Sequence, residues 1–126
     1  MNHDHLSTGR IGEDLACRFL EDHGIRIIER NFRTPFAEID IIAQDADTLC
    51  FIEVKTRTNV SKALPRNAVN PAKQLKITKG AQAYLKNKGL FNTRSRFDVI
   101  EVIMDGKCKP APALQINHIR HAFGAA

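Results

Sequence analysis

The chain has 126 residues, 43% of them hydrophobic, and this length is enough for a single domain, residues 1–126, with its own buried core. Three widely spaced cysteines argue against a disulfide scaffold or a zinc cluster, and no apolar run approaches the length of a membrane span. The N-terminus also lacks a basic and then apolar signal region, so we expect a soluble cytoplasmic protein.

An uneven distribution of charge lies behind the net charge of +5. Residues 1–53 carry 5 basic and 11 acidic side chains, whereas residues 54–97 carry 11 basic side chains and no acid. A segment of this kind is typical of a surface that binds a polyanion such as nucleic acid, with a helix face kept positive for solubility as the alternative. The residues expected to contact nucleic acid are Arg57, Lys62, Arg66, Lys73, Gln74, Lys76 and Lys79.

The first predicted element is a helix that Ser7 or Thr8 can cap and that runs to about Asp22, after a disordered start over residues 1–6. Apolar residues cover about half of the surface of this helix. Glu13 lies at the border of the apolar side, where a carboxylate needs a partner. An acid in the first turn that only offsets the helix dipole is the simpler alternative for Glu13.

Three strands follow the helix. The first covers about residues 25–32, and Pro35 then turns the chain into a hairpin formed by residues 38–42 and 51–57. The residues between the last two strands are few and polar, which favours an antiparallel pair.

The register of this hairpin follows from keeping apolar side chains opposite one another. With Ala46 and Asp47 at the tip, Asp40 stands opposite Glu53. Because side chains alternate along a strand, Lys55 lies on the same face as Glu53. A slip by two residues would place Asp40 against Lys55, so both allowed registers gather the two acids and the lysine.

Asp40 and Glu53 are candidate ligands of a divalent cation. Opposed side chains in such a pair have Cβ atoms about 4.5 to 5.5 Å apart, and two carboxylates this close repel unless a cation lies between them. Mg²⁺ suits the pair, because it takes oxygen ligands and uses one or two carboxylates together with substrate phosphate. Lys55 could orient or deprotonate an attacking water. A solvated hairpin with a cross-strand ion pair is the alternative interpretation.

A loop and a second helix are predicted next. Residues 58–70 show no periodicity and predict a mobile basic loop. Asn70 and Pro71 are typical of a helix start, and the helix reaches Lys88 before Gly89 ends it.

The end of the chain supplies at least one further strand. Residues 96–104 are rich in branched side chains and predict a buried strand, parallel to residues 51–57 because a long helical crossover joins the two. Residues 114–123 are expected to dock as a short helix or strand. His118 and His121 are spaced to share a helix face, where a packing role is favoured over metal binding.

The order α-β-β-β-α-β, with an acid on the first helix, an acid on the second strand and Glu-x-Lys on the third, is similar to the restriction endonuclease-like, PD-(D/E)xK fold. That fold is a three-layer α/β core with a mixed sheet flanked by helices. Within it, the chain most resembles archaeal-type Holliday junction resolvases. More closely, it resembles the YraN-like family of small bacterial proteins, through Gly9 to Glu13, Arg30 to Arg33, Glu38 to Ile42, Phe51 to Arg57, Arg96 to Val99 and Ile119 to Phe123.

The resemblance implies roles for individual residues. Asp40, Glu53 and the Val54 carbonyl would hold Mg²⁺ or Mn²⁺, Lys55 would serve the attacking water, and Glu13 would reach the metal through water. The reaction would be hydrolysis of a phosphodiester in duplex or branched DNA that leaves a 5′-phosphate. By analogy with the resolvases, the protein would act as a homodimer.

Two other functions remain open at this point. One is a nucleic-acid-binding protein of the same fold without catalytic turnover, and the other is an interaction module that docks on an acidic protein. With one tyrosine and no tryptophan, the chain has little with which to build a stacking platform for single strands, so recognition of duplex shape is expected.

Overall fold

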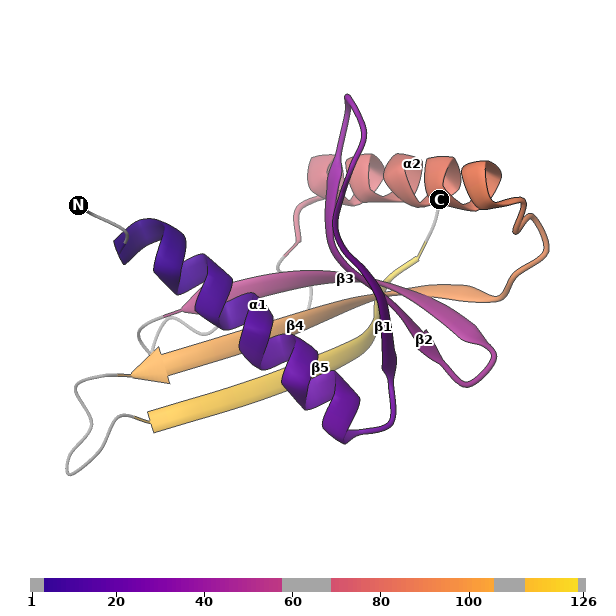
Figure 1. The fold of residues 1–126 in the computed structure, drawn as a ribbon. Coiled ribbons are helices and arrows are strands. Elements are labelled where there is room, and N and C mark those ends of the chain that lie inside the picture. Colours follow the sequence, from indigo (N-terminus) through magenta and orange to yellow (C-terminus); the bar gives the residue numbers. More distant parts are fainter. Residues whose placement is uncertain (1–3, 58–68, 106–112, 125–126) are drawn as a thin grey trace.

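The computed structural model describes residues 4–57, 69–105 and 113–124, which form a mixed sheet with one helix on each face (Figure 1). The order α-β-β-β-α-β-β confirms the predicted α/β core and adds a final strand. The elements in chain order are α1 (Asp4–Asp22), β1 (Arg26–Arg33), β2 (Glu38–Asp45), β3 (Thr48–Arg57), α2 (Pro71–Lys88), β4 (Ser95–Asp105) and β5 (Ala113–Phe123).

The strands lie in the order β1-β2-β3-β4-β5 across the sheet. Among the described strands, β3 and β4 pair in parallel, as α2 between them predicts, and the other neighbours are antiparallel. In the β2–β3 hairpin Ile41 pairs with Ile52 and Ile42 with Phe51, and Ala46 takes a positive φ of 54° at the tip. The predicted register of the hairpin is therefore confirmed.

Each helix covers its own hydrophobic core. On one face α1 buries Ala16 and Leu20 against β-strand residues such as Ile41 and Ile52. On the other face α2 buries a second group of side chains, made up of Ile39, Ile42, Leu49, Phe51, Val69, Ile77, Ala81, Tyr84, Phe97 and Val99. The three layers that the resemblance implies are thus present.

The ends of α2 follow from local sequence, as predicted. The Asn70 side chain accepts a hydrogen bond of 2.8 Å from the Lys73 backbone N–H, Pro71 occupies the first helical turn, and Gly89 ends the helix with a left-handed φ of 67°. Neither described helix is long and apolar enough to cross a membrane.

Two details differ from the predictions, and a third prediction falls outside the described residues. The first helix begins at Asp4, one turn before Ser7 and Thr8, because a helix anchored by its buried residues can extend outward on its own backbone hydrogen bonds. The tail is strand β5, so the helix face proposed for His118 and His121 does not exist. Residues 1–3 and 58–68, and with them Lys62, Arg66 and most of the predicted basic loop, lie outside the described residues.

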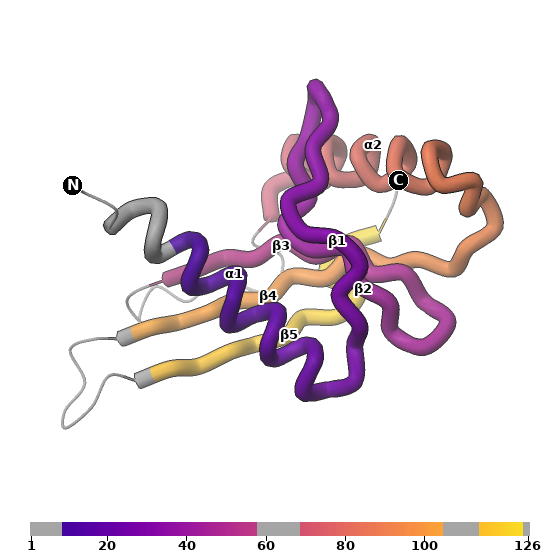
Figure 2. The backbone as a smooth tube through the Cα atoms, in the orientation of Figure 1, coloured from indigo at the N-terminus to yellow at the C-terminus, as the bar shows by residue number. Residues whose placement is uncertain are grey.

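The hairpin of β1 and β2 leaves the plane of the sheet. Figure 2 shows its connecting turn rising past α2, whereas the other end of β2 stays beside β3. Strict alternation predicts Ile39 on the same face as Ile41, but Ile39 packs on the α2 side with Ile42. The twist of the hairpin toward α2 explains the change of face.

Candidate active site

The candidate site lies where two central strands part. Backbone pairing between β2 and β3 runs from Asp45 to Ile41 and ends there. Strand β3 continues beside β4 as far as Arg57. At the point of divergence the Asp40 side chain replaces the missing strand contact, because the Val54 N–H donates a hydrogen bond of 2.8 Å to Asp40 Oδ2. The opening between β2 and β3 therefore carries a carboxylate held by backbone.

Asp40 and Glu53 meet in this opening, as the sequence predicts. Glu53 is buried, and its carboxyl lies within hydrogen-bonding reach of the Asp40 carboxyl. Burial and the neighbouring Glu53 carboxylate raise the pKa of Asp40 to about 8, against the opposing effect of the Val54 N–H. Asp40 thus retains a proton at neutral pH when no cation lies between the two acids.

Two lysines from different elements contact the same acid. Lys55 Nζ lies 3.2 Å and Lys73 Nζ 2.8 Å from Glu53 Oε2. The hydrogen bond to Glu53 raises the pKa of Lys73 above its ordinary value. Lys73 is predicted only as a contact for nucleic acid, yet the structure places it at the carboxylate pair, because the first turn of α2 lies within reach of Glu53.

Glu13 and Arg57 lie at the borders of the site. Glu13 Oε1 is 3.4 Å from Arg30 Nη2, and the Glu13 charge adds to the elevation of the Asp40 pKa, so Glu13 is close enough to act on the pair electrostatically. Arg57 ends β3, and its buried Nε has no hydrogen-bond partner within the described residues. An unpaired buried donor here is a ready position for an anionic oxygen.

The donor atoms suit a hard divalent cation. Asp40 and Glu53 supply carboxylate oxygens, and the Val54 carbonyl points to the same side of β3 as its N–H, which faces Asp40. In the described part of the chain no group of three or more His, Cys, Asp or Glu side chains could hold a metal. A cation here would need water or phosphate oxygens to complete its shell, as Mg²⁺ and Mn²⁺ commonly do.

The remaining predicted basic residues lie along α2. Lys76 and Lys79 line a pocket beside the turn between β1 and β2. Gln74 Nε2 donates a hydrogen bond of 2.7 Å to the Val69 carbonyl, so its amide holds the entry to the helix. The described side chains of α2 include lysines but no acid, since the helix contains neither Asp nor Glu.

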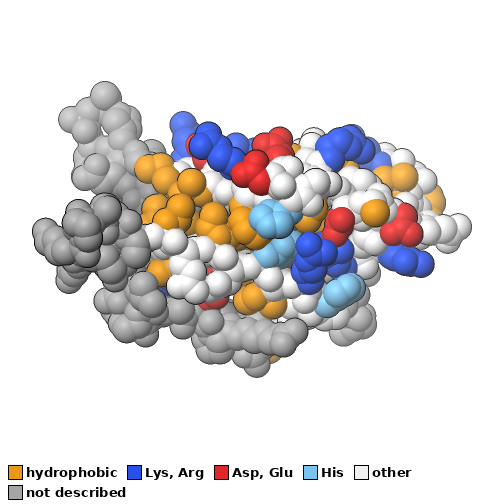
Figure 3. Space-filling view, turned by 90° about the horizontal axis from the view of Figure 1, so that it is seen from below, with side chains coloured by type: hydrophobic (Ala, Val, Ile, Leu, Met, Phe, Trp, Pro, Cys, Tyr) orange, Lys and Arg blue, Asp and Glu red, His pale blue; other side chains and the backbone are white. Residues whose placement is uncertain are grey.

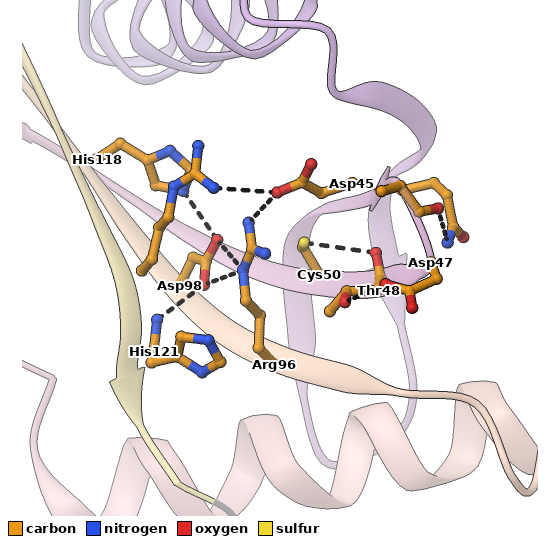
Figure 4. Close-up of polar contacts among 11 residues, drawn as sticks. Asp45, Asp47, Thr48, Cys50, Arg96, Asp98, His118 and His121 are labelled. Atoms are coloured by element: carbon orange, nitrogen blue, oxygen red, sulfur yellow. Dashed lines mark hydrogen bonds and ion pairs between the residues drawn. The ribbon is translucent and has the colours of Figure 1, made fainter.

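The structure contains a second polar cluster that is not among the predictions from the sequence. Asp98 is fully buried, and its carboxyl makes three contacts (Figure 4). It accepts hydrogen bonds from Arg96 Nε at 3.0 Å and from the His121 backbone N–H at 3.1 Å, and it lies 2.8 Å from His118 Nε2. Although burial opposes the shift, His118 and Arg96 hold the pKa of Asp98 below its ordinary value. Arg96 also reaches Asp45 at 2.8 Å, so the cluster joins β4, β5 and the end of β2.

The signal for this cluster is present in the sequence. Arg96 and Asp98 are separated by two positions on a strand rich in apolar residues, which puts both on one face. Glu101 is a further buried acid on β4. It pairs in register with Lys55 and accepts a hydrogen bond of 3.3 Å from Asn117.

The face of the molecule opposite α2 carries mixed charge. In Figure 3 histidine, basic and acidic side chains adjoin one another on this face, with apolar side chains between them. A surface of mixed sign is a poor match for a polyanion. The lysines of α2, next to the carboxylate pair, form a region of positive charge without acids on the same helix.

The fold and the site together define an α/β protein with paired carboxylates and lysines where two central strands part. The model of the uncharacterised protein family UPF0102 matches residues 12–102, and the chain belongs to this family. The resemblance to the YraN-like family is thereby confirmed.

Relatives from several bacteria extend over almost the whole chain. A UPF0102 protein of Desulforapulum autotrophicum is 46% identical over 98% of this chain and 98% of its own length. One from Geobacter sulfurreducens is 43% identical over 99% of this chain and 94% of its own length. One from Rhodococcus jostii is 40% identical, with 94% and 98% covered.

Proposed function

We propose that this protein is a metal-dependent nuclease that hydrolyses phosphodiester bonds in duplex or branched DNA. The observation that carries the proposal is the meeting of the Asp40 and Glu53 carboxyls where β2 and β3 part, with Lys55 on the same acid. Two acids that force a proton onto one of them form a site that a divalent cation can occupy in place of the proton.

Each group of the candidate site has its own role in the proposed reaction. Asp40, Glu53 and the Val54 carbonyl would hold Mg²⁺ or Mn²⁺, and the Val54 N–H fixes the Asp40 carboxylate in place. When bound, the metal ion supplies Lewis-acid stabilisation of charge on the phosphate and the leaving oxygen. Lys55, 3.2 Å from Glu53, would orient the attacking water, and Glu13 would act on the site from α1 through water.

Phosphate contacts are available beside the site. The buried Arg57 Nε, unpaired within the described residues, can donate to a phosphate oxygen. Arg57 lies two residues after Lys55 on β3. Lys73, Lys76 and Lys79 follow along α2 with no acid among them. A DNA backbone lying along α2 would meet these groups and reach the carboxylate pair at the start of the helix.

A binding protein of the same fold without turnover is the second candidate. It is favoured by one contact, the 2.8 Å ion pair between Lys73 Nζ and Glu53 Oε2. An ammonium group that already neutralises Glu53 competes with a metal ion for the same oxygen. If Lys73 holds this place permanently, the site binds DNA and does not cleave it.

Cleavage assays separate the two candidates. Branched, flapped and linear DNA with labelled ends are incubated with Mn²⁺ and the wild type, Asp40→Asn, Lys55→Met or Asp47→Asn. Asp47 is the matched control, an exposed acid between β2 and β3 whose partner Arg94 lies 3.7 Å away. We expect Asp40→Asn and Lys55→Met to lower the cleavage rate by at least about a hundredfold, and Asp47→Asn to leave it unchanged.

Two results decide against the nuclease. Cleavage by Asp40→Asn at the wild-type rate would assign the activity to a contaminant. No cleavage of any substrate, together with DNA binding that weakens steeply with salt, would establish the binding protein instead.

A further inference from the structure

The turn between β1 and β2 presents an aromatic ring to solvent. Phe36 is 73% exposed at the tip of this turn, which rises past α2 in Figures 1 and 2. The turn is held rigidly, because Thr34 Oγ1 accepts hydrogen bonds from the backbone N–H groups of Phe36 at 3.1 Å and Ala37 at 3.0 Å. The Thr34 N–H donates to the Ala37 carbonyl at 2.8 Å. These hydrogen bonds fix the backbone that carries the exposed ring.

A pocket of about 560 Å³ lies between this turn and α2. Its walls combine apolar side chains with two ammonium groups, and are formed by Pro35, Phe36, Ala72, Leu75, Lys76 and Lys79. Leu75 is itself 53% exposed. The volume is in the range of small-molecule sites, and an apolar floor with a basic rim matches a flat nucleobase that carries a phosphate.

The pocket leads toward the carboxylate pair. A smaller hollow of about 250 Å³ adjoins it through Phe36 and Lys76, and is also lined by Lys73. Lys73 is the residue whose ammonium group contacts Glu53. Glu38 is the one acid that lines this hollow, and Arg33 Nε pairs with it at 2.6 Å.

Charge complementarity favours an anionic occupant, and the exposed ring beside the lysines favours nucleic acid over an acidic protein surface. The α2 wall carries lysines and no acid, which disfavours a basic or neutral protein surface and favours a phosphate chain. An exposed phenylalanine beside such a wall offers a ring on which a base can stack, or a wedge that separates a base from its neighbour. Fully paired duplex has no free base face to offer, so the site selects DNA with an unpaired base.

We propose that Phe36 stacks on an unpaired base at a fork or branch in DNA, that the base enters the pocket between the β1–β2 turn and α2, and that Lys76 and Lys79 hold its phosphate. The proposal rests on the proposed action on DNA and names the feature of the substrate that the site selects. It gives the β1–β2 turn a role in recognition that is separate from the cleavage groups.

A binding experiment tests this role without cleavage. The affinity of the protein in EDTA is measured by fluorescence anisotropy for a forked DNA and for a paired duplex with the same number of phosphates. The forked DNA carries 2-aminopurine as the unpaired base at the branch. The variants are Phe36→Ala, Phe36→Tyr and Phe91→Ala. Phe91 is the matched control, because it is also 73% exposed but follows α2 and lines neither hollow.

We expect Phe36→Ala to weaken binding to the fork roughly tenfold and to leave binding to the duplex unchanged, since stacking on one base is worth about that much. Phe36→Tyr retains the ring and should bind the fork like the wild type, as should Phe91→Ala. Binding of the wild type should change the 2-aminopurine fluorescence, because the base leaves its neighbours and meets the ring, and binding of Phe36→Ala should not.

Three other results overturn the proposal. Equal binding of fork and duplex, unchanged in Phe36→Ala, leaves the proposed function intact and removes the role of Phe36 in recognition. Weaker fork binding by Phe36→Ala, with no change in 2-aminopurine fluorescence when the wild type binds, excludes movement of the base onto the ring. Absence of binding to either DNA by the wild type removes the proposed function and this role together.

Discussion

Asp40 shows how one buried side chain links the fold to its chemistry. Its carboxyl is held by the Val54 N–H and lies against the Glu53 carboxyl, and its pKa is about 8 in the folded chain against 3.8 ordinarily. Between these values the unfolded chain has released a proton that the folded chain still holds. Stability therefore falls as the pH rises from about 4 to about 8, because ionised Asp40 is destabilising in the folded state.

The variant Asp40→Asn should remove this pH dependence. In EDTA we expect it to be more stable than the wild type at pH 8 by at least about 1 kcal/mol, and close to the wild type at pH 4. Urea unfolding at several pH values measures the difference. Wild-type and variant curves that stay parallel from pH 4 to pH 8 would contradict the account of the pair.

Asp98 is predicted to be structural. It is buried with the Arg96 guanidinium and His118 against it, so Asp98→Asn removes the more deeply buried of the two carboxylates, Asp45 and Asp98, that contact Arg96. Removing one partner of a buried pair costs about 3–5 kcal/mol, and we expect a loss of this size in the free energy of unfolding. The control is Asp47→Asn, whose partner Arg94 is 3.7 Å away at the surface, and which should change stability by less than about 0.5 kcal/mol. A loss below about 1 kcal/mol for Asp98→Asn would show that the cluster does not hold the strands together.

At the scale of elements, the position of α1 depends on a close approach to β3. A Cβ atom added at Gly12 would overlap Thr56 Oγ1, whereas one added at Gly9 would meet nothing within 4 Å. We expect Gly12→Ala to destabilise the fold by about 1–3 kcal/mol and Gly9→Ala to stabilise it by about 0.5–1 kcal/mol, because alanine favours an open helix position. Thermal unfolding of both variants checks the two signs. A stabilising Gly12→Ala would mean that α1 does not pack as closely as the structure shows.

Elements defined by local signals could be predicted from the sequence, and those defined by distant partners could not. Asn70, Pro71 and Gly89 fix the ends of α2, and the polar tip at Ala46 fixes the hairpin register, because these signals act on neighbouring residues. Strand β5 could not be assigned, since a strand is defined by pairing with β4. The face of Ile39 was also beyond reach, because it depends on how the hairpin twists.

The same distinction holds for the candidate site. The grouping of Asp40, Glu53 and Lys55 follows from register alone and agrees with the structure. The position of Lys73 beside Glu53 does not follow from register, because it depends on where the first turn of α2 lies in the folded chain. Phe36 was overlooked for a different reason, since a count of tyrosine and tryptophan passes over a phenylalanine at the tip of a turn.

At the scale of the whole molecule, the two faces of the sheet differ in charge. Helix α2 has lysines and no acid, whereas the opposite face shows side chains of both signs (Figure 3). The account therefore predicts that DNA lies along α2. Neutralising Lys76 and Lys79 together with glutamine should lower the slope of log affinity against log salt by about 1.8, since each phosphate contact contributes about 0.9.

The control for this prediction is on the other face. Arg18 is exposed on α1, so Arg18→Gln should leave the slope unchanged. Titrations of a fluorescent duplex at several salt concentrations supply the slopes. A larger effect of Arg18→Gln than of the α2 double variant would place the DNA on the α1 face.

Calorimetric titration with Mn²⁺ tests the central claim most directly, because it measures the occupant of the carboxylate pair without a substrate. We predict one site in the wild type and in Asp47→Asn, and no detectable site in Asp40→Asn or Glu53→Gln. Mn²⁺ binding that persists unchanged in both Asp40→Asn and Glu53→Gln, or that is absent from the wild type, would contradict the claim that these two acids form a metal site.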